Sequence, residues 1–155
     1  MKAICIIDTT IFLEILNVPN KAAQHKQTMA ELKEKISAGE FLFLPMPTII
    51  ETGNHIAQNG DGDQRRKAAL RFVNHIEKAL EGDSPFTPID FLTSEKLKTW
   101  LKEFPDSAMR GSGLGDLSII KDWERQCKLH KAMRVYIWSL DEHLSAYELN
   151  PRILA

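Results

Sequence analysis

The sequence lacks the features that mark membrane and secreted proteins. No apolar run approaches the roughly 18 residues of a transmembrane helix, and the N-terminus does not have the shape of a signal peptide. Only two cysteines occur, Cys5 and Cys127, both in apolar segments and without CxxC spacing. We therefore expect two buried thiols in a cytoplasmic protein with no membrane association, and neither a disulfide nor a zinc site.

A strong charge of one sign is also lacking. The 20 Lys and Arg residues nearly balance the 21 Asp and Glu residues, so the formal net charge is -1. A polyanionic partner would have to meet a local basic patch or be bridged by metal ions. The best patch stands near the start of a predicted helix and consists of Arg65, Arg66, Lys67 and Arg71. Such a run is most often a solvated helix face, and a weak contact with an RNA backbone is the alternative.

Apolar runs and helical periodicity alternate along the chain, which fits a single domain over residues 1–155. Uninterrupted apolar runs predict buried strands at 4–7, 41–44 and 135–138, and 85–92 is an ambiguous strand weakened by Pro88. Helical patterns fall at about 11–17, 21–38, 48–58, 64–80, 94–104 and 116–130, with a loop expected at 105–115. This order predicts an α/β three-layer sandwich around a mainly parallel sheet.

Four acidic side chains stand where these elements predict one edge of the sheet. Asp8 and Asp141 follow the first and last predicted strands, and Glu51 and Asp116 stand near helix starts. Ligands of open parallel sheets bind at this edge. Converging carboxylates repel one another unless divalent cations lie between them, and oxygen ligands favour Mg²⁺ or Mn²⁺. Such an ion can activate water and neutralise charge on a phosphoryl group.

Each acid also has a plainer interpretation. Asp8 can simply be the N-cap of the next helix. Thr9 or Thr10 can also fill that position. Glu51 lies opposite the apolar side of its predicted helix, whose N-cap we assign to Thr48, so a solvent-facing glutamate is equally consistent. On the helix that begins at Asp116, that acid shares the apolar face, whereas Asp122 falls on the far side and is expected to be solvated.

From IIDTTIF to SLDEHL, the chain resembles the PIN-domain ribonucleases, which include the VapC-type toxins of bacterial toxin–antitoxin pairs. The resemblance rests on Asp8-Thr9-Thr10 after a strand, Glu51 after the second strand, GLGDLSII with Asp116, and Ser139-Leu140-Asp141. It implies the strand order 3-2-1-4-5. It also implies a metal-holding quartet of Asp8, Glu51, Asp116 and Asp141, supported by the hydroxyls of Thr9 or Thr10 and of Ser139.

The same resemblance implies an activity and partners. The activity is Mg²⁺- or Mn²⁺-dependent endonucleolytic cleavage of RNA, in which water attacks in line at phosphorus and leaves a 5′-phosphate. The partners are the RNA substrate, a small antitoxin protein and a second copy in a homodimer. The alternative is a catalytically silent PIN-like scaffold that binds a partner protein or RNA. A haloacid-dehalogenase-type phosphatase is disfavoured, because Thr10 stands where its second Asp is needed.

Overall fold

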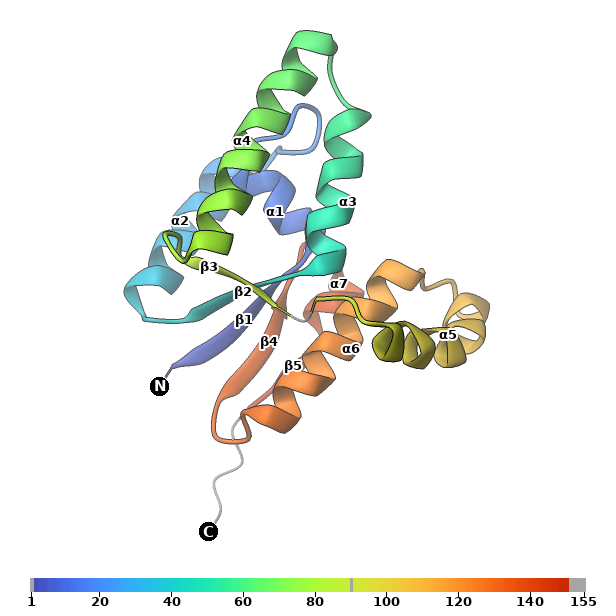
Figure 1. Ribbon diagram of the computed structural model, residues 1–155. Coiled ribbons are helices and arrows are strands. Elements are labelled where there is room, and N and C mark those ends of the chain that lie inside the picture. Colours follow the sequence, from blue (N-terminus) through green and yellow to red (C-terminus); the bar gives the residue numbers. More distant parts are fainter. Residues whose placement is uncertain (1, 90, 151–155) are drawn as a thin grey trace.

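The computed structural model describes residues 2–89 and 91–150 and contains one five-stranded sheet (Figure 1). The strand order is β3-β2-β1-β4-β5, as predicted, with parallel pairing between β3, β2, β1 and β4 and antiparallel pairing of β5 with β4. The strands are β1 (Ala3–Ile7), β2 (Phe41–Pro45), β3 (Phe86–Ile89), β4 (Arg134–Trp138) and β5 (Glu148–Leu149).

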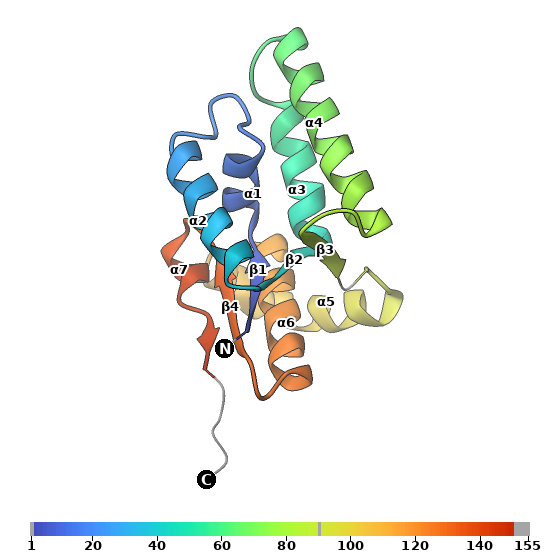
Figure 2. The same ribbon diagram turned by 90° about the vertical axis from the view of Figure 1, so that its left-hand side faces the viewer.

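Helices cover both faces of the sheet and make the three layers of the predicted sandwich (Figures 1 and 2). The helices are α1 (Thr9–Ile15), α2 (His25–Ser37), α3 (Met46–Ala57), α4 (Gly62–Glu81), α5 (Ser94–Met109), α6 (Leu114–Leu129) and α7 (Glu142–Ser145). Along the fully buried β1, Cys5 and Ile7 pack in the core with α1 to α4, whereas Ile4 and Ile6 pack with α6 and α7. This alternation follows from the two-residue period of a strand.

The apolar runs identified in the sequence are confirmed as strands. The ambiguous segment 85–92 forms only the short β3, and residue 90 lies outside the described residues. Because β3 is an edge strand, Pro88 can be accommodated without removing a hydrogen bond from the sheet interior. The two-residue β5 has no run of apolar residues that would have predicted it.

The segment between α5 and α6 differs from the predicted loop over 105–115. Helix α5 continues through Pro105 to Met109. Arg110 is its C-cap, and Gly111 follows with a φ of 81°, in the left-handed region that favours glycine. The amide of Ser112 then donates to the carbonyl of Ser107 at 2.9 Å, which closes the helix end as a Schellman turn does. The connection between α5 and α6 is therefore short and covers residues 110–113.

No helix within the described ranges is both long and apolar enough to cross a membrane. Both cysteines are free thiols; Cys5 is buried as predicted, and Cys127 is only partly buried. Burial raises the pKa of Cys5 to about 12 and that of Cys127 to about 11.

Candidate active site

Asp8 is the most tightly held of the predicted site residues. It follows the last residue of β1, and its amide donates to the carbonyl of Trp138 at 3.0 Å, which extends the β1–β4 ladder by one bond. Only 3% of the residue is exposed. Its Oδ2 accepts hydrogen bonds from Thr10 Oγ1 at 2.8 Å and Ser139 Oγ at 2.7 Å. Asp8 is also the N-cap of α1, so it is both a helix cap and a residue of the predicted site.

Two hydroxyl groups connect the ends of β1 and β4. Thr10 Oγ1 lies 3.3 Å from Ser139 Oγ and accepts a hydrogen bond from the amide of Leu140 at 3.0 Å. Ser139 Oγ accepts another from the amide of Asp141 at 2.9 Å. Thr10 therefore makes the supporting contacts, whereas Thr9 is buried beside it. The network fixes the Asp8 carboxylate relative to the backbone that carries Asp141.

Asp141 and Asp116 each stand at the beginning of a helix. Asp141 is exposed and caps α7, accepting the amide of His143 on Oδ1 at 2.9 Å. Asp116 lies half-buried in the first turn of α6, whose N-cap is Gly113. The partial positive charge of a helix N-terminus favours a carboxylate at such a position.

Glu51 reaches the same edge from α3. The predicted Thr48 cap is wrong, because Pro45 is the N-cap and Thr48 lies inside the helix. The buried Thr48 Oγ1 instead donates to the carbonyl of Ile7 at 2.7 Å, which fastens the start of α3 to the end of β1. A Cβ built on Gly115 would lie 3.5 Å from Glu51 Oε1. Glu51 is exposed, and its carboxylate lies beside the first turn of α6.

The four acids line one hollow of about 440 Å³, which we call the acidic hollow. Its polar lining is completed by Thr9, Thr10 and His55, and its apolar lining includes Leu13, Ile119 and Leu144. The structure thus brings together carboxylates from β1–α1, α3, α6 and β4–α7. His55 was missed by the sequence analysis, although it stands one helical turn after Glu51, a spacing that places two side chains on one face.

The acidic hollow is electrostatically costly without a cation. Burial raises the pKa of Asp116 above its ordinary value of 3.8, and the negative charges of Asp8, Asp141 and Glu51 raise it further, while His143 opposes them. The donors are carboxylates and hydroxyls, which suit a hard divalent cation that keeps several waters. Within residues 2–89 and 91–150, however, no three His, Cys, Asp or Glu side chains are already close enough to form a metal cluster.

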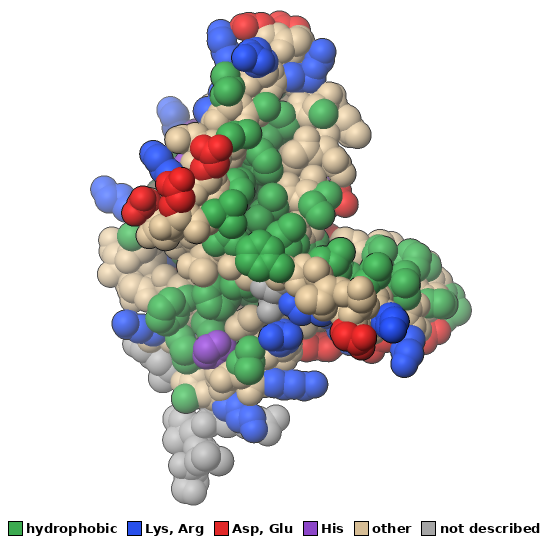
Figure 3. All heavy atoms as spheres, in the orientation of Figure 1, with side chains coloured by type: hydrophobic (Ala, Val, Ile, Leu, Met, Phe, Trp, Pro, Cys, Tyr) green, Lys and Arg blue, Asp and Glu red, His purple; other side chains and the backbone are tan. Residues whose placement is uncertain are grey.

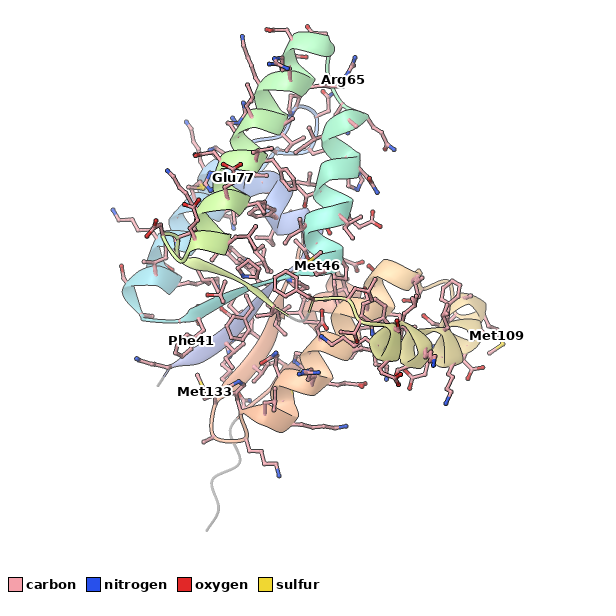
Figure 4. All side chains as sticks on the ribbon, viewed as in Figure 1. Phe41, Met46, Arg65, Glu77, Met109 and Met133 are labelled. Carbon is pink, nitrogen blue, oxygen red and sulfur yellow. The ribbon has the colours of Figure 1, made fainter. Side chains whose placement is uncertain are left out.

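The predicted basic cluster lies away from this edge. Its members Arg65, Arg66, Lys67 and Arg71 occupy the first half of α4, and Arg65 stands at the tip of the α3–α4 hairpin (Figure 4). None of them lines the acidic hollow. The Arg71 guanidinium donates to the carbonyls of Leu16 at 3.1 Å and Asn17 at 3.2 Å, and Lys67 pairs with Asp63 at 2.9 Å.

Asp122 on α6 does not lie on a solvated helix face. It was predicted to be solvated, but only 2% of it is exposed. Helix α6 does not have a single buried face, because it packs against β4 on one side and contacts α3 and α5 on others. A substitution at Asp122 therefore cannot serve as a surface control for Asp116.

Comparisons with known proteins bear on the fold. No family model matches the sequence, and no curated protein does. The chain is similar to one in the solved structure of FitAB bound to the IR36 DNA fragment, with a TM-score of 0.56 and 17% sequence identity. The similarity covers 92% of this chain and 88% of that chain. Together with the observed strand order, this similarity shows that the chain has a PIN-like α/β fold.

Proposed function

We propose that the protein is a metal-dependent endoribonuclease that acts as the toxin of a toxin–antitoxin pair. The observation that carries this proposal is the acidic hollow, in which Asp8, Glu51, Asp116 and Asp141 meet from four separate segments. Four carboxylates around one hollow are a costly arrangement unless positive charge enters it. A ligand that brings divalent cations and a phosphodiester together fits this requirement.

In this proposal the four acids would hold Mg²⁺ or Mn²⁺, with waters completing the coordination. When bound, the ion supplies an activated water and neutralises charge on the phosphoryl group. The protein's own side chains hold the acids in place. Thr10 and Ser139 fix one carboxylate oxygen of Asp8 by donating hydrogen bonds to it. The Thr48 bond to the end of β1 sets where Glu51 stands relative to Asp8.

The proposal predicts RNA cleavage that requires both a divalent ion and the acids. Purified protein should cleave single-stranded RNA with Mn²⁺ or Mg²⁺, stop in chelator and recover when the ion is restored. Asp8→Asn and Asp116→Asn should each lower the cleavage rate by about a hundredfold or more. Mutating a residue that only supports a metal ligand already lowers metal affinity or activity by about 10–100-fold, so loss of a ligand itself should cost at least as much. Asparagine keeps the shape and, at Asp8, the ability to cap α1.

Asp83→Asn provides the matched control for these variants. Asp83 is exposed in the turn after α4 and does not line the acidic hollow. The Asp83→Asn protein should cleave RNA at the wild-type rate. Activity that survives exhaustive chelation, or an Asp83→Asn protein as inactive as Asp116→Asn, would contradict the assignment.

A catalytically silent PIN-like scaffold is the second candidate. It is favoured by the absence, in the part of the chain that the structure describes, of a preformed cluster of three metal-ligating side chains. A silent scaffold would bind a protein or RNA partner and would show no cleavage at any metal concentration. The chelation experiment therefore separates the two candidates.

The proposed antitoxin and homodimer partners need apolar surface, and α3 and α4 carry it. Ile50, Leu70, Val73 and Leu80 are each between 45% and 58% exposed. Hydrophobic side chains gather over this region and continue toward α5 (Figure 3). Contiguous exposed apolar surface is typical of protein–protein interfaces. Sedimentation of the protein alone, and again after co-expression with the product of the neighbouring reading frame, tests both partners.

A further inference from the structure

A second hollow adjoins the acidic hollow and is not used by the proposed chemistry. It has a volume of about 550 Å³, within the range of small-molecule sites. It lies between the end of α5, the first half of α6 and the α7 segment. Asp116 and Asp141 line both hollows. An extended ligand that occupies both must therefore pass directly over these two carboxylates.

Arg110 gives the second hollow a cation that the protein does not otherwise use. It caps α5, is exposed, and forms no ion pair or side-chain hydrogen bond with any residue in the ranges 2–89 and 91–150. The other cation, Lys121, is already engaged, because it pairs with Glu103 and with Glu124 at 2.9 Å. Arg110 is thus the cation of this hollow that is available to a phosphate.

Ser112 supplies an unused hydroxyl in the same wall. Its Oγ is buried and has no hydrogen-bond partner among the described residues. The Schellman-type turn at Gly111 fixes Ser112 in place through its amide, and its carbonyl accepts from Ser107 Oγ at 3.1 Å. A buried hydroxyl without a partner is unfavourable, so a rotation that turns the Ser112 hydroxyl from its buried position toward a ligand in the hollow gains free energy.

Aromatic rings form the opposite part of the lining. His143 and Tyr147 both line the hollow, and their ring centroids lie 5.9 Å apart at an interplanar angle of 89°. Tyr147 is held from behind by Trp123, with centroids 5.2 Å apart. Aromatic side chains beside a cation are the combination with which proteins bind single-stranded nucleic acid, since bases stack on the rings and phosphates meet the cation.

We propose that the second hollow binds the nucleotide next to the scissile phosphate of a single-stranded RNA, with Arg110 on its phosphate, Tyr147 and His143 beside its base and Ser112 bonding to it. This inference rests on the proposed function, because it takes Asp116 and Asp141 as the point of cleavage. Three further carboxylates line the hollow. Glu103 and Glu124 share the charge of Lys121, and Asp106 forms no ion pair among the described residues, so a bound phosphate depends on Arg110 and on the divalent ion that Asp116 and Asp141 would hold.

The test measures binding of a short fluorescent single-stranded RNA by anisotropy, in an Asp116→Asn background with Mg²⁺ present. Arg110→Ala should weaken binding roughly fivefold and lower the slope of log affinity against log salt by about 0.7. Tyr147→Leu should weaken it roughly tenfold by removing a stacking surface, and Tyr147→Phe should bind as tightly as the parent protein. A thermal melt of each variant identifies any loss of folding.

Lys102→Ala is the matched control, because it removes the same charge from α5 at an exposed position that lines neither hollow. Ser112→Ala should weaken RNA binding and at the same time raise the melting temperature, since an unpartnered buried hydroxyl is removed. A residue with only a structural role would not show these two opposite effects.

The outcomes separate this inference from the proposed function. If wild-type protein cleaves RNA but Arg110→Ala and Tyr147→Leu bind it as Lys102→Ala does, the second hollow is not a nucleotide subsite and the nuclease assignment stands. If the oligonucleotide binds through Arg110 and Tyr147 but wild-type protein never cleaves it, the subsite stands and the nuclease assignment fails. If no single-stranded RNA binds at all, both are overturned and the hollow is left to a protein partner.

Discussion

At the scale of single residues, Asp116 is the side chain whose environment differs most from that of a free carboxyl within the candidate site. Burial and the neighbouring Asp8, Asp141 and Glu51 raise its pKa above 3.8. The folded chain therefore binds this proton more readily than the unfolded chain does. It follows that the free energy of unfolding falls as the pH rises from 3.8 through the raised folded pKa.

Asp116→Asn should consequently stabilise the metal-free protein at pH 7. Partial exposure screens the repulsion, so we expect a rise in Tm of at most about 2–4 °C. The advantage should shrink as the pH falls through the raised pKa, because the wild-type carboxyl then takes up its proton. Mg²⁺ should raise the Tm of wild-type protein more than that of the variant, because a ligand that binds only the folded state stabilises it.

Thermal melts at pH 4 and pH 7, with and without Mg²⁺, check this expectation. Asp83→Asn, which changes an exposed acid that does not line the acidic hollow, should show neither the pH dependence nor the change in the response to Mg²⁺. An Asp116→Asn protein that melts below wild type at pH 7 would mean that the carboxylate is satisfied by the fold itself.

At the scale of elements, the start of α3 determines where Glu51 stands. The helix has no side-chain cap, and Thr48, which is fully buried, donates instead to the carbonyl at the end of β1. This bond joins two elements that are more than 40 residues apart at the point where the acids converge. The placement of Glu51 relative to Asp8 therefore depends on a hydroxyl that is not itself in the hollow.

Thr48→Val should destabilise the protein by about 1–2 kcal/mol, because it keeps the shape but removes a buried hydrogen bond. It should also lower RNA cleavage roughly tenfold by loosening the position of Glu51. Thr48→Ser is the control: it loses a methyl group, at a cost of about 1 kcal/mol, but keeps the bond to Ile7. Chemical denaturation and cleavage rates measure both effects. Equal activity of the Val and Ser variants would show that the hydroxyl does not position the site.

The strands and most helices could be predicted because their apolar periodicity is local. Asp8 and Asp141 could be placed at one edge because Asp8 directly follows a buried strand and Asp141 stands three residues after the end of another. Glu51 could be placed at the same edge from the start of its helix, but whether its side chain faces the site or solvent stayed open. A helical wheel gives a direction and not the neighbour, here Gly115, that the side chain meets. The burial of Asp122 and the continuation of α5 through Pro105 depend on how α5 and α6 pack, which no single segment encodes. The second hollow likewise arises only from the packing of α5, α6 and α7.

At the scale of the whole molecule, the charges are divided between two regions. The acids gather at the sheet edge, whereas Arg65 lies at the tip of the α3–α4 hairpin (Figure 4) and Arg66 follows it in α4. Helix α3 continues beyond His55, the last of its residues that line the acidic hollow, before the chain turns into α4. Neither hollow includes a residue of the basic cluster. With a formal net charge of -1, the molecule has no overall attraction for a polyanion.

This separation makes the predicted RNA contact of the basic cluster depend on the length of the RNA. A short oligonucleotide that fills only the hollows should bind Arg65→Ala/Arg66→Ala and the parent protein equally. A longer single strand can extend to the hairpin, and the double variant should then lower the slope of log affinity against log salt by about 0.7 for each phosphate that the protein no longer neutralises. Salt titrations in the Asp116→Asn background, with both RNA lengths, measure the two slopes. Parallel lines for the long RNA would identify the cluster as an ordinary solvated helix face. Weaker binding confined to the long RNA would place its path along α3 and α4.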